Sequence, residues 1–167
     1  MTTSIPETCT PAWAHSTGVI DLQPVGKVPT DLATLADRLM IQETAARYAI
    51  AYDERRLDVL ESLYTENGTY AYRIGEGPLE GRTGRADLVA WLDEIMQSQT
   101  DQRRHMLSSL VIDQLTADKA VVIAYKSIYG IERTAELITT GMYRFSMVKQ
   151  DGSWLIDEAI DCLDRGF

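Results

Sequence analysis

Two residues of this chain, Asp53 and His105, have the chemistry of an acid–base pair. Asp53 follows Ala45 and Ala49 at i+4 spacing, so a carboxylate stands at the edge of a helix face that should be buried. Burying an ionised carboxylate costs several kcal/mol, roughly, unless a partner compensates it. His105 lies in a strand-like run, and a neutral imidazole is a base near physiological pH. We therefore expect the two side chains to meet in a pocket. A buried structural pair and a surface aspartate at a helix end are the alternatives.

The helix that carries Asp53 should begin at a cap, Thr30 or Asp31, and end near Arg55. Its apolar face is marked by helical spacing and comprises Ile41, Ala45, Tyr48, Ala49 and Tyr52, extended toward the N-terminus by Leu32, Leu35 and Leu39. A short helix is expected at 57–64, with Gly68 as a left-handed cap after it. A third amphipathic helix is expected at 85–98, after a glycine-rich loop.

The remaining segments are rich in β-favouring residues. Strands are expected at 69–74, 105–115, 119–131, 136–148 and 153–163. The last four are joined by short turns, which require antiparallel neighbours. Helices followed by a curved antiparallel meander form an α+β arrangement. The long first helix must then cross the concave face of the sheet, and the space between them is the natural pocket.

Composition narrows the function classes. The formal net charge of −9 argues against nucleic acid and against anionic membranes as partners, because both require a basic patch. No apolar run is long enough to span a bilayer, and the N-terminus lacks the features of a secretory signal. Cys9 and Cys162 have no motif spacing, which favours a reducing compartment and a cytoplasmic protein. Two histidines and two scattered cysteines predict no metal site, and no phosphate-binding loop appears, so we expect cofactor-free chemistry.

The chain should form one domain at 30–167, preceded by an arm at 1–29 that holds four of the five prolines. Three interpretations of the arm are open: it forms a frayed tail, it covers a pocket as a flap, or it contacts a neighbouring subunit. It also contains His15, a lone histidine with no expected chemical role.

The order of these elements resembles the SnoaL-like branch of the superfamily that includes nuclear transport factor two, ketosteroid isomerase and scytalone dehydratase. The resemblance covers about residues 30–165. It rests on ARYAIAYDERRLDVLESLYTENGTY, EGRTGRADLVAWL, RHMLSSLVI and GSWLIDEAI. It implies a cone-shaped α+β barrel in which three N-terminal helices pack on a curved mixed or antiparallel sheet. Because such folds host many activities, function has to be argued from the site.

The same resemblance implies roles for individual residues. In scytalone dehydratase and hexachlorocyclohexane dehydrochlorinase, an aspartate near the end of the first helix holds a histidine that removes a proton, and Asp53 and His105 match these positions. Tyr52 and Tyr72 match tyrosines that hold the substrate carbonyl through water, with Tyr48 as a further candidate. This sequence departs from scytalone dehydratase in having no second histidine in its sheet.

Other candidate substrate-binding residues come from strand alternation. Ser109 shares its parity with His105 and is expected in the same cavity. Tyr125 and Tyr129 share one face of their strand, and Tyr143 and Phe145 share one face of the next. Either pair is expected to form the base of an aromatic pocket or to belong to the hydrophobic core.

These observations lead to a functional hypothesis. We expect a cofactor-independent lyase or isomerase of the dehydratase type, acting on a small cyclic, aromatic or polyketide-like substrate of secondary metabolism. A non-catalytic supporting module, similar to the small subunit of ring-hydroxylating dioxygenases, is the alternative, as is a hydrolase or cyclase in the same pocket. Both faces of strands 119–131 and 136–148 carry large apolar groups, which predicts a homo-oligomer, a dimer or else a trimer.

Overall fold

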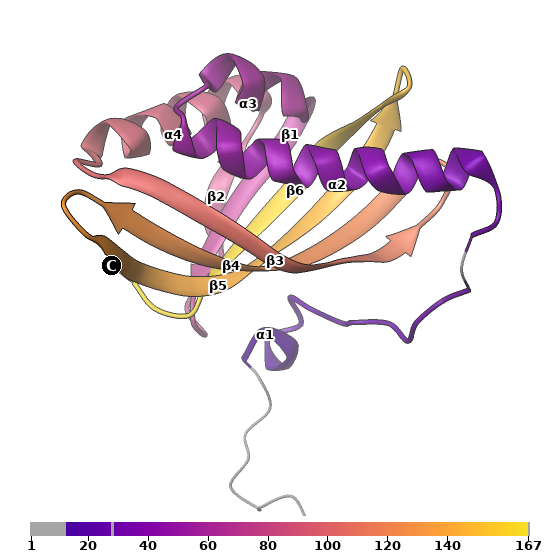
Figure 1. Cartoon of the computed structure of the whole chain (residues 1–167), viewed down its shortest axis with the longest axis horizontal. Coiled ribbons are helices and arrows are strands. Elements are labelled where there is room, and N and C mark those ends of the chain that lie inside the picture. The colour runs from indigo at the N-terminus through magenta and orange to yellow at the C-terminus, as the bar shows by residue number, and fades with distance from the viewer. Residues whose placement is uncertain (1–12, 28, 167) are drawn as a thin grey trace, which may run out of the picture.

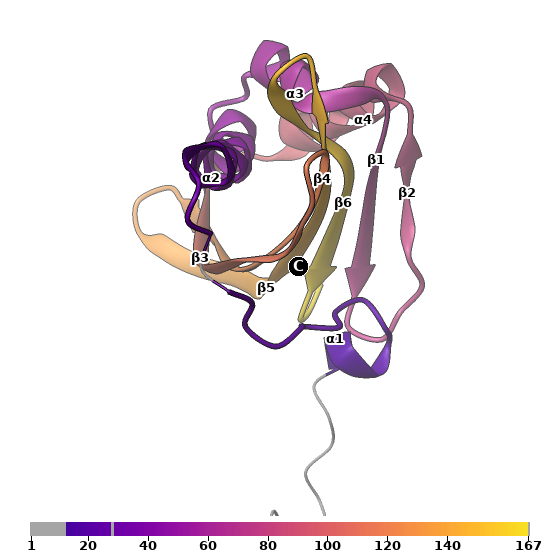
Figure 2. The same cartoon turned by 90° about the vertical axis from the view of Figure 1, so that its right-hand side faces the viewer.

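The computed structural model describes residues 13–27 and 29–166. Three helices lie over one face of a curved sheet: α2 (Leu32–Asp53), α3 (Leu57–Leu63) and α4 (Arg85–Ser98). Figure 1 shows α2 crossing the strands, with α3 and α4 beside its C-terminal end. A four-residue helix, α1 (Trp13–Ser16), lies apart from these three, near the loop that joins β1 to β2 (Figure 2).

The sheet has six strands in the order β2-β1-β6-β5-β4-β3. Their bounds are β1 (Tyr64–Ile74), β2 (Glu80–Thr83), β3 (Gln102–Leu115), β4 (Lys119–Ile131), β5 (Ala135–Gln150) and β6 (Ser153–Leu163). Every neighbouring pair is antiparallel except β1 and β6, which run parallel. The sheet curves around the helices but remains open, with β2 and β3 as its edges (Figure 2). The expected α+β cone of helices on a mixed sheet is confirmed.

Helix α2 begins where the sequence predicted, because the Asp31 side chain caps it by accepting a hydrogen bond from the Thr34 amide at 2.8 Å. From Ile41 onward the predicted apolar face is buried. The prediction that three leucines near the N-terminus extend this face is wrong: Leu32, Leu35 and Leu39 are 85%, 41% and 68% exposed. In this part α2 contacts the sheet through the polar side chain of Asp37, which pairs with Lys149 and Trp154, and the leucines remain exposed. A groove of about 820 Å³ separates the helix from residues 22–27 and the end of β3.

The prediction that Gly68 caps a helix is also wrong. Strand β1 begins directly after α3, at Tyr64, and Gly68 lies inside it with no left-handed φ. A Cβ atom there would lie 2.9 Å from Cδ1 of the Tyr64 ring. The glycine is therefore required by close packing against Tyr64 within a bulged part of the strand.

The core fills the space between the helices and the concave face of the sheet. Its largest fully buried side chains include Trp154, Tyr48, Tyr64, Tyr143 and Phe145. Tyr48 packs edge-on against Tyr64, Tyr143 and Phe145, with ring centroids 5.4–6.2 Å apart. Among the described helices, none is both long and apolar enough to cross a membrane. Four residues of this core, Tyr52, Tyr70, Leu92 and Tyr143, also line a cavity.

Candidate active site

A cavity of about 380 Å³ opens between the C-terminal ends of α2 and α4 and the concave face of the sheet. Most of its wall is aromatic or aliphatic and includes Tyr70, Tyr72, Trp91, Leu92, Ile95 and Tyr143. Its polar groups are Tyr52, Gln99, Arg103, His105 and Asp161. An apolar cavity of this size with a few convergent polar groups is typical of a small-molecule site.

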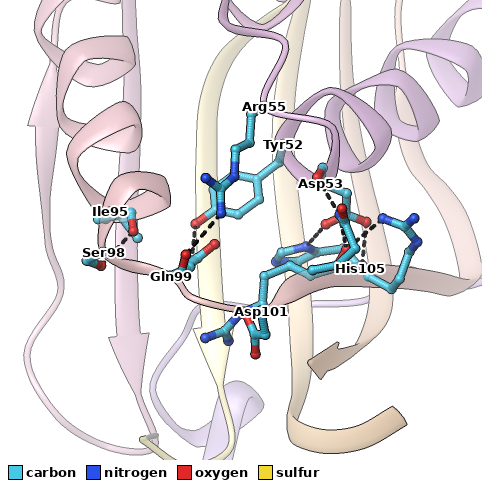
Figure 3. A network of polar contacts seen from close by, with 11 residues as sticks. Tyr52, Asp53, Arg55, Ile95, Ser98, Gln99, Asp101 and His105 are labelled. Atoms are coloured by element: carbon cyan, nitrogen blue, oxygen red, sulfur yellow. Dashed lines mark hydrogen bonds and ion pairs between the residues drawn. The ribbon is translucent and has the colours of Figure 1, made fainter. Parts of the chain in front are cut away.

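Asp53 and His105 meet at the wall of this cavity. One carboxylate oxygen of Asp53, Oδ2, accepts a hydrogen bond from the His105 backbone N–H at 2.7 Å. The other, Oδ1, lies 2.6 Å from His105 Nδ1. In a neutral imidazole held by an ionised carboxylate, which only accepts hydrogen bonds, Nδ1 carries the proton and Nε2 is the unprotonated nitrogen. Only 7% of the Asp53 side chain and 6% of the His105 side chain are exposed, and Figure 3 shows the contact.

The end of α2 is built to hold Asp53 in this place. Helix α2 stops at Asp53 because Arg55 adopts a left-handed conformation (φ 53°), and the amide of Arg56 donates back to the Ala51 carbonyl at 2.8 Å. Strand β3 is fastened to this turn beside the histidine, since Gln102 Nε2 donates to the Asp53 carbonyl at 2.7 Å. The Arg55 guanidinium donates to the Gln99 carbonyl at 3.0 Å, which ties α2 to the end of α4 (Figure 3).

Tyr52 supplies a hydroxyl next to the histidine. Its ring lies edge-on to the His105 ring at 4.8 Å, and its oxygen accepts a hydrogen bond from Gln99 Nε2 at 3.0 Å. Because this oxygen acts as an acceptor, the phenolic proton remains available to donate into the cavity. Burial raises the pKa of Tyr52 above its usual value, so the phenol stays protonated at neutral pH.

A second polar group lines the cavity on the sheet side. The carboxylate of Asp161, on β6, pairs with the ammonium group of Lys126, on β4, and accepts a hydrogen bond from the Tyr70 hydroxyl at 2.8 Å. The Lys126 Nζ also lies 4.3 Å from the centre of the Tyr143 ring. The Lys126 side chain is completely buried, and this burial lowers the pKa of its ammonium group.

The structure brings some of the predicted site residues together. Tyr52, Tyr72 and Tyr143 line the cavity with His105. The Tyr72 hydroxyl donates to Glu80 at 2.8 Å, while its ring stacks on Trp91 at 5.9 Å, so this residue contributes a flat wall.

Two other candidates belong to the core. Tyr48 and Phe145 pack against each other beneath the cavity, at 1% and 0% exposure, and neither is among the lining residues. Their expected contact with a substrate is corrected to a supporting position, because neighbouring rings cover both side chains.

The remaining candidates do not line the cavity. Ser109 is exposed because the strand bulges between Ser108 and Val111, with Ser109 in a left-handed conformation (φ 50°), and the bulge breaks the alternation that the prediction used. Tyr125 is 56% exposed on the convex face, and Tyr129, half-buried, shares its parity. On β4 it is the opposite parity, represented by Lys126 and Ile128, that faces inward.

Sequence reasoning missed Lys126, Asp161, Gln99 and Arg103 as site residues. A usable signal existed for the first two, since each places a charge at a position whose strand neighbours of the same parity are apolar. Gln99 and Arg103 carry no such signal, because both lie at the junction between α4 and β3. Arg103 forms an ion pair with Asp101 at 2.6 Å. Among the residues at 13–27 and 29–166, no cluster of three or more metal-binding side chains occurs.

Residues 33–159 match the model of the SnoaL-like domain. The chain belongs to the SnoaL-like family. An uncharacterized protein of Mycobacterium tuberculosis, strain H37Rv, is 26% identical to this SnoaL-like protein over 132 residues, which span 78% of this chain and 87% of the relative.

Solved structures share the fold at lower sequence identity. A scytalone dehydratase-like protein of Novosphingobium aromaticivorans is 22% identical, with a TM-score of 0.67 over 81% of this chain and 87% of that one. An aromatic-ring-hydroxylating dioxygenase-like β subunit from the same organism is 15% identical, with a TM-score of 0.70 over 82% of this chain and 94% of that one. At these identities the similarity defines the cone fold, and the activity has to come from the site.

Proposed function

We propose that this SnoaL-like protein is a dehydratase-type lyase or isomerase that removes a proton from the carbon next to a carbonyl group. One observation carries the proposal: Asp53 contacts both the backbone and the ring of His105 at the wall of an apolar cavity. A histidine oriented in this way by a buried carboxylate has the geometry of a general base.

Each polar group has a role in such a reaction. The Nε2 atom of His105 accepts the substrate proton, and the negative charge of Asp53 stabilises the imidazolium that results. The Tyr52 phenol donates a hydrogen bond to the carbonyl oxygen as it gains negative charge, while Gln99 orients the phenol. These steps use only side chains of the chain itself, in line with cofactor-independent catalysis.

The wall of the cavity favours a small hydrophobic or aromatic substrate. The Tyr72 and Trp91 rings are nearly parallel, with an interplanar angle of 17°, and Tyr70 lies against the same indole at 5.4 Å. Flat aromatic surfaces bind flat rings, so a cyclic or polyketide-like ketone fits better than a flexible chain. The volume of about 380 Å³ has room for two or three fused rings.

The test is enolate formation, which dehydration and isomerisation have in common. The purified protein is incubated with 1-tetralone in D₂O, and loss of the proton signal at the carbon next to the carbonyl is followed by NMR. The proposal expects exchange well above the buffer rate that falls by at least about 10²-fold in His105→Gln. A panel of cyclic ketones that shows no enzyme-dependent exchange would refute it.

A supporting-subunit role is the second candidate, favoured by the apolar convex face of the sheet. Met106, Tyr125 and Leu137 are 57%, 56% and 46% exposed there, and exposed apolar patches mark interaction surfaces. The dioxygenase-like β subunit has the same fold. We propose that this face forms the contact between copies of the chain. A protein that is stable by itself and exchanges ketone protons would rule against the supporting role.

A further inference from the structure

The wall of the cavity includes one member of an ion pair that the proposed proton abstraction does not use. Lys126 reaches Asp161 from β4 to β6, across β5, and its side chain is completely buried. Asp161 lines the cavity and is 5% exposed, and the Tyr70 hydroxyl holds its second carboxylate oxygen at 2.8 Å. The pair therefore touches the substrate space at its aspartate and is closed off from water at its lysine.

Stability alone gives a weak explanation for this pair. Removing two charges from water costs several kcal/mol per ion, roughly, and apolar residues of the same volume are often as stable or more so. The rest of the concave surface of β4 shows that apolar side chains fit here, since Val122, Ala124 and Ile128 are all buried. Lys126 and Asp161 can share one proton. The net charge of the pair is zero whether the proton is on the lysine or on the aspartate.

We propose that Lys126 and Asp161 are the proton source for the hydroxyl group that leaves in the proposed dehydration. The inference rests on the proposed function, because His105 must first remove the proton next to the carbonyl. It assigns the two halves of an elimination to two groups that line one cavity: the base is His105 on β3 and the acid is supplied through Asp161 on β6.

The reaction balances as follows. The C–H bond next to the carbonyl breaks and its proton goes to His105 Nε2. The electron pair forms the new C=C bond, and the C–O bond to the hydroxyl breaks. Asp161 passes a proton to the departing oxygen, and Lys126 replaces it, so water leaves and Lys126 remains as a neutral amine. When the product has left, solvent in the cavity takes the proton from His105, and Lys126 regains a proton from solvent through Asp161.

Burial favours this direction of transfer. The pKa of the Lys126 ammonium group is lowered because the group is buried, which makes it a stronger acid than a surface lysine. The Tyr70 hydroxyl fixes the carboxylate of Asp161 at the wall of the cavity.

The experiment compares two leaving groups on one ring. The probes are 3-hydroxy-1-tetralone, whose loss of hydroxide needs an acid, and 3-acetoxy-1-tetralone, whose acetate leaves without one. Both give 1-naphthol, which is followed by its fluorescence. The variants are Asp161→Asn and the double variant Asp161→Asn with Lys126→Met, which leaves no unpaired buried charge. Lys149→Met is the matched control, because it removes a lysine whose ion pair, with Asp37, lies outside the cavity.

The inference expects the rate ratio of the hydroxy to the acetoxy compound to fall by at least about 10²-fold in both variants, and to stay within about twofold in Lys149→Met. An unchanged ratio in either Asp161 variant would overturn it. So would a wild-type protein that exchanges the protons of 1-tetralone but does not dehydrate the hydroxy compound. A wild-type protein with no activity in either assay refutes the proposed function itself, which is a different result.

Discussion

The carboxylate of Asp53 contacts His105 twice, at the backbone N–H at 2.7 Å and at ring Nδ1 at 2.6 Å. The first contact fixes the strand against the end of α2, and the second fixes the tautomer of the imidazole. One carboxylate therefore sets both the position and the tautomer of the candidate base.

If this pair acts as one unit, Asp53→Asn and His105→Ala should each lower turnover of a ketone substrate by roughly 10²–10⁴. The double variant should lose little more than the worse single variant, because each substitution already removes the function of the pair. Steady-state rates of proton exchange provide the measurement. His105→Gln keeps volume and hydrogen bonding but removes basicity. If that variant melts early yet keeps full activity, His105 is a structural histidine.

Tyr52→Phe removes one hydrogen-bond donor next to the base and keeps the ring that packs on His105. We expect the rate of proton exchange to fall by about 10²-fold, as it does when a single oxyanion donor is lost, with little change in melting temperature. Tyr129→Phe removes a hydroxyl from a tyrosine outside the cavity and serves as the matched control. Equal rates for the two variants would argue against a donor role for Tyr52.

Asp37 joins α2 to the last two strands. Its carboxylate accepts hydrogen bonds from Lys149 Nζ at 2.7 Å and Trp154 Nε1 at 3.0 Å, and the lysine and then the indole lower the pKa of this carboxyl group. Asp37→Asn should reduce the free energy of unfolding at pH 7 by about 1–2 kcal/mol. The folded-state pKa lies below the unfolded value of about 3.9, so this contribution is complete above that pH and is lost as the pH falls through the folded pKa.

Urea denaturation of the wild type and Asp37→Asn at pH 7 and at pH 3 measures this effect. The difference in unfolding free energy should become smaller at the lower pH. A difference that grows on acidification would contradict the assignment.

The convex face of the sheet provides a test of assembly. We expect light scattering at micromolar concentration to give twice the 18.7 kDa mass of one chain, or a higher multiple. Tyr125→Glu places a charge in the middle of the exposed apolar face and should shift the mass toward that of a monomer. Thr116→Glu, in the turn between β3 and β4, introduces the same charge away from that face. A wild-type monomer under these conditions would contradict the prediction.

The sequence by itself determined most of the elements and the pairing of Asp53 with His105. Helical spacing from Ile41 to Tyr52 predicted the buried face of α2, and Asp53 at the edge of that face pointed to a buried partner, which is His105 in the structure. Periodicity is sufficient for this because burial repeats every 3.6 residues on a helix and every two on a strand. The same rule failed at Leu32 and Leu39, which are exposed although Asp37 between them contacts the sheet.

Only the tertiary structure decided which strand face lines the cavity and which distant side chains meet there. A single bulge moved Ser109 out of register with His105, and no local pattern marks where a strand gains an extra residue. Lys126 and Asp161 are 35 residues apart and lie on strands separated by β5, so their contact depends on strand order and sheet curvature. Pairing across a sheet is a property of the whole fold, because each strand's neighbours are set by the packing of all the others.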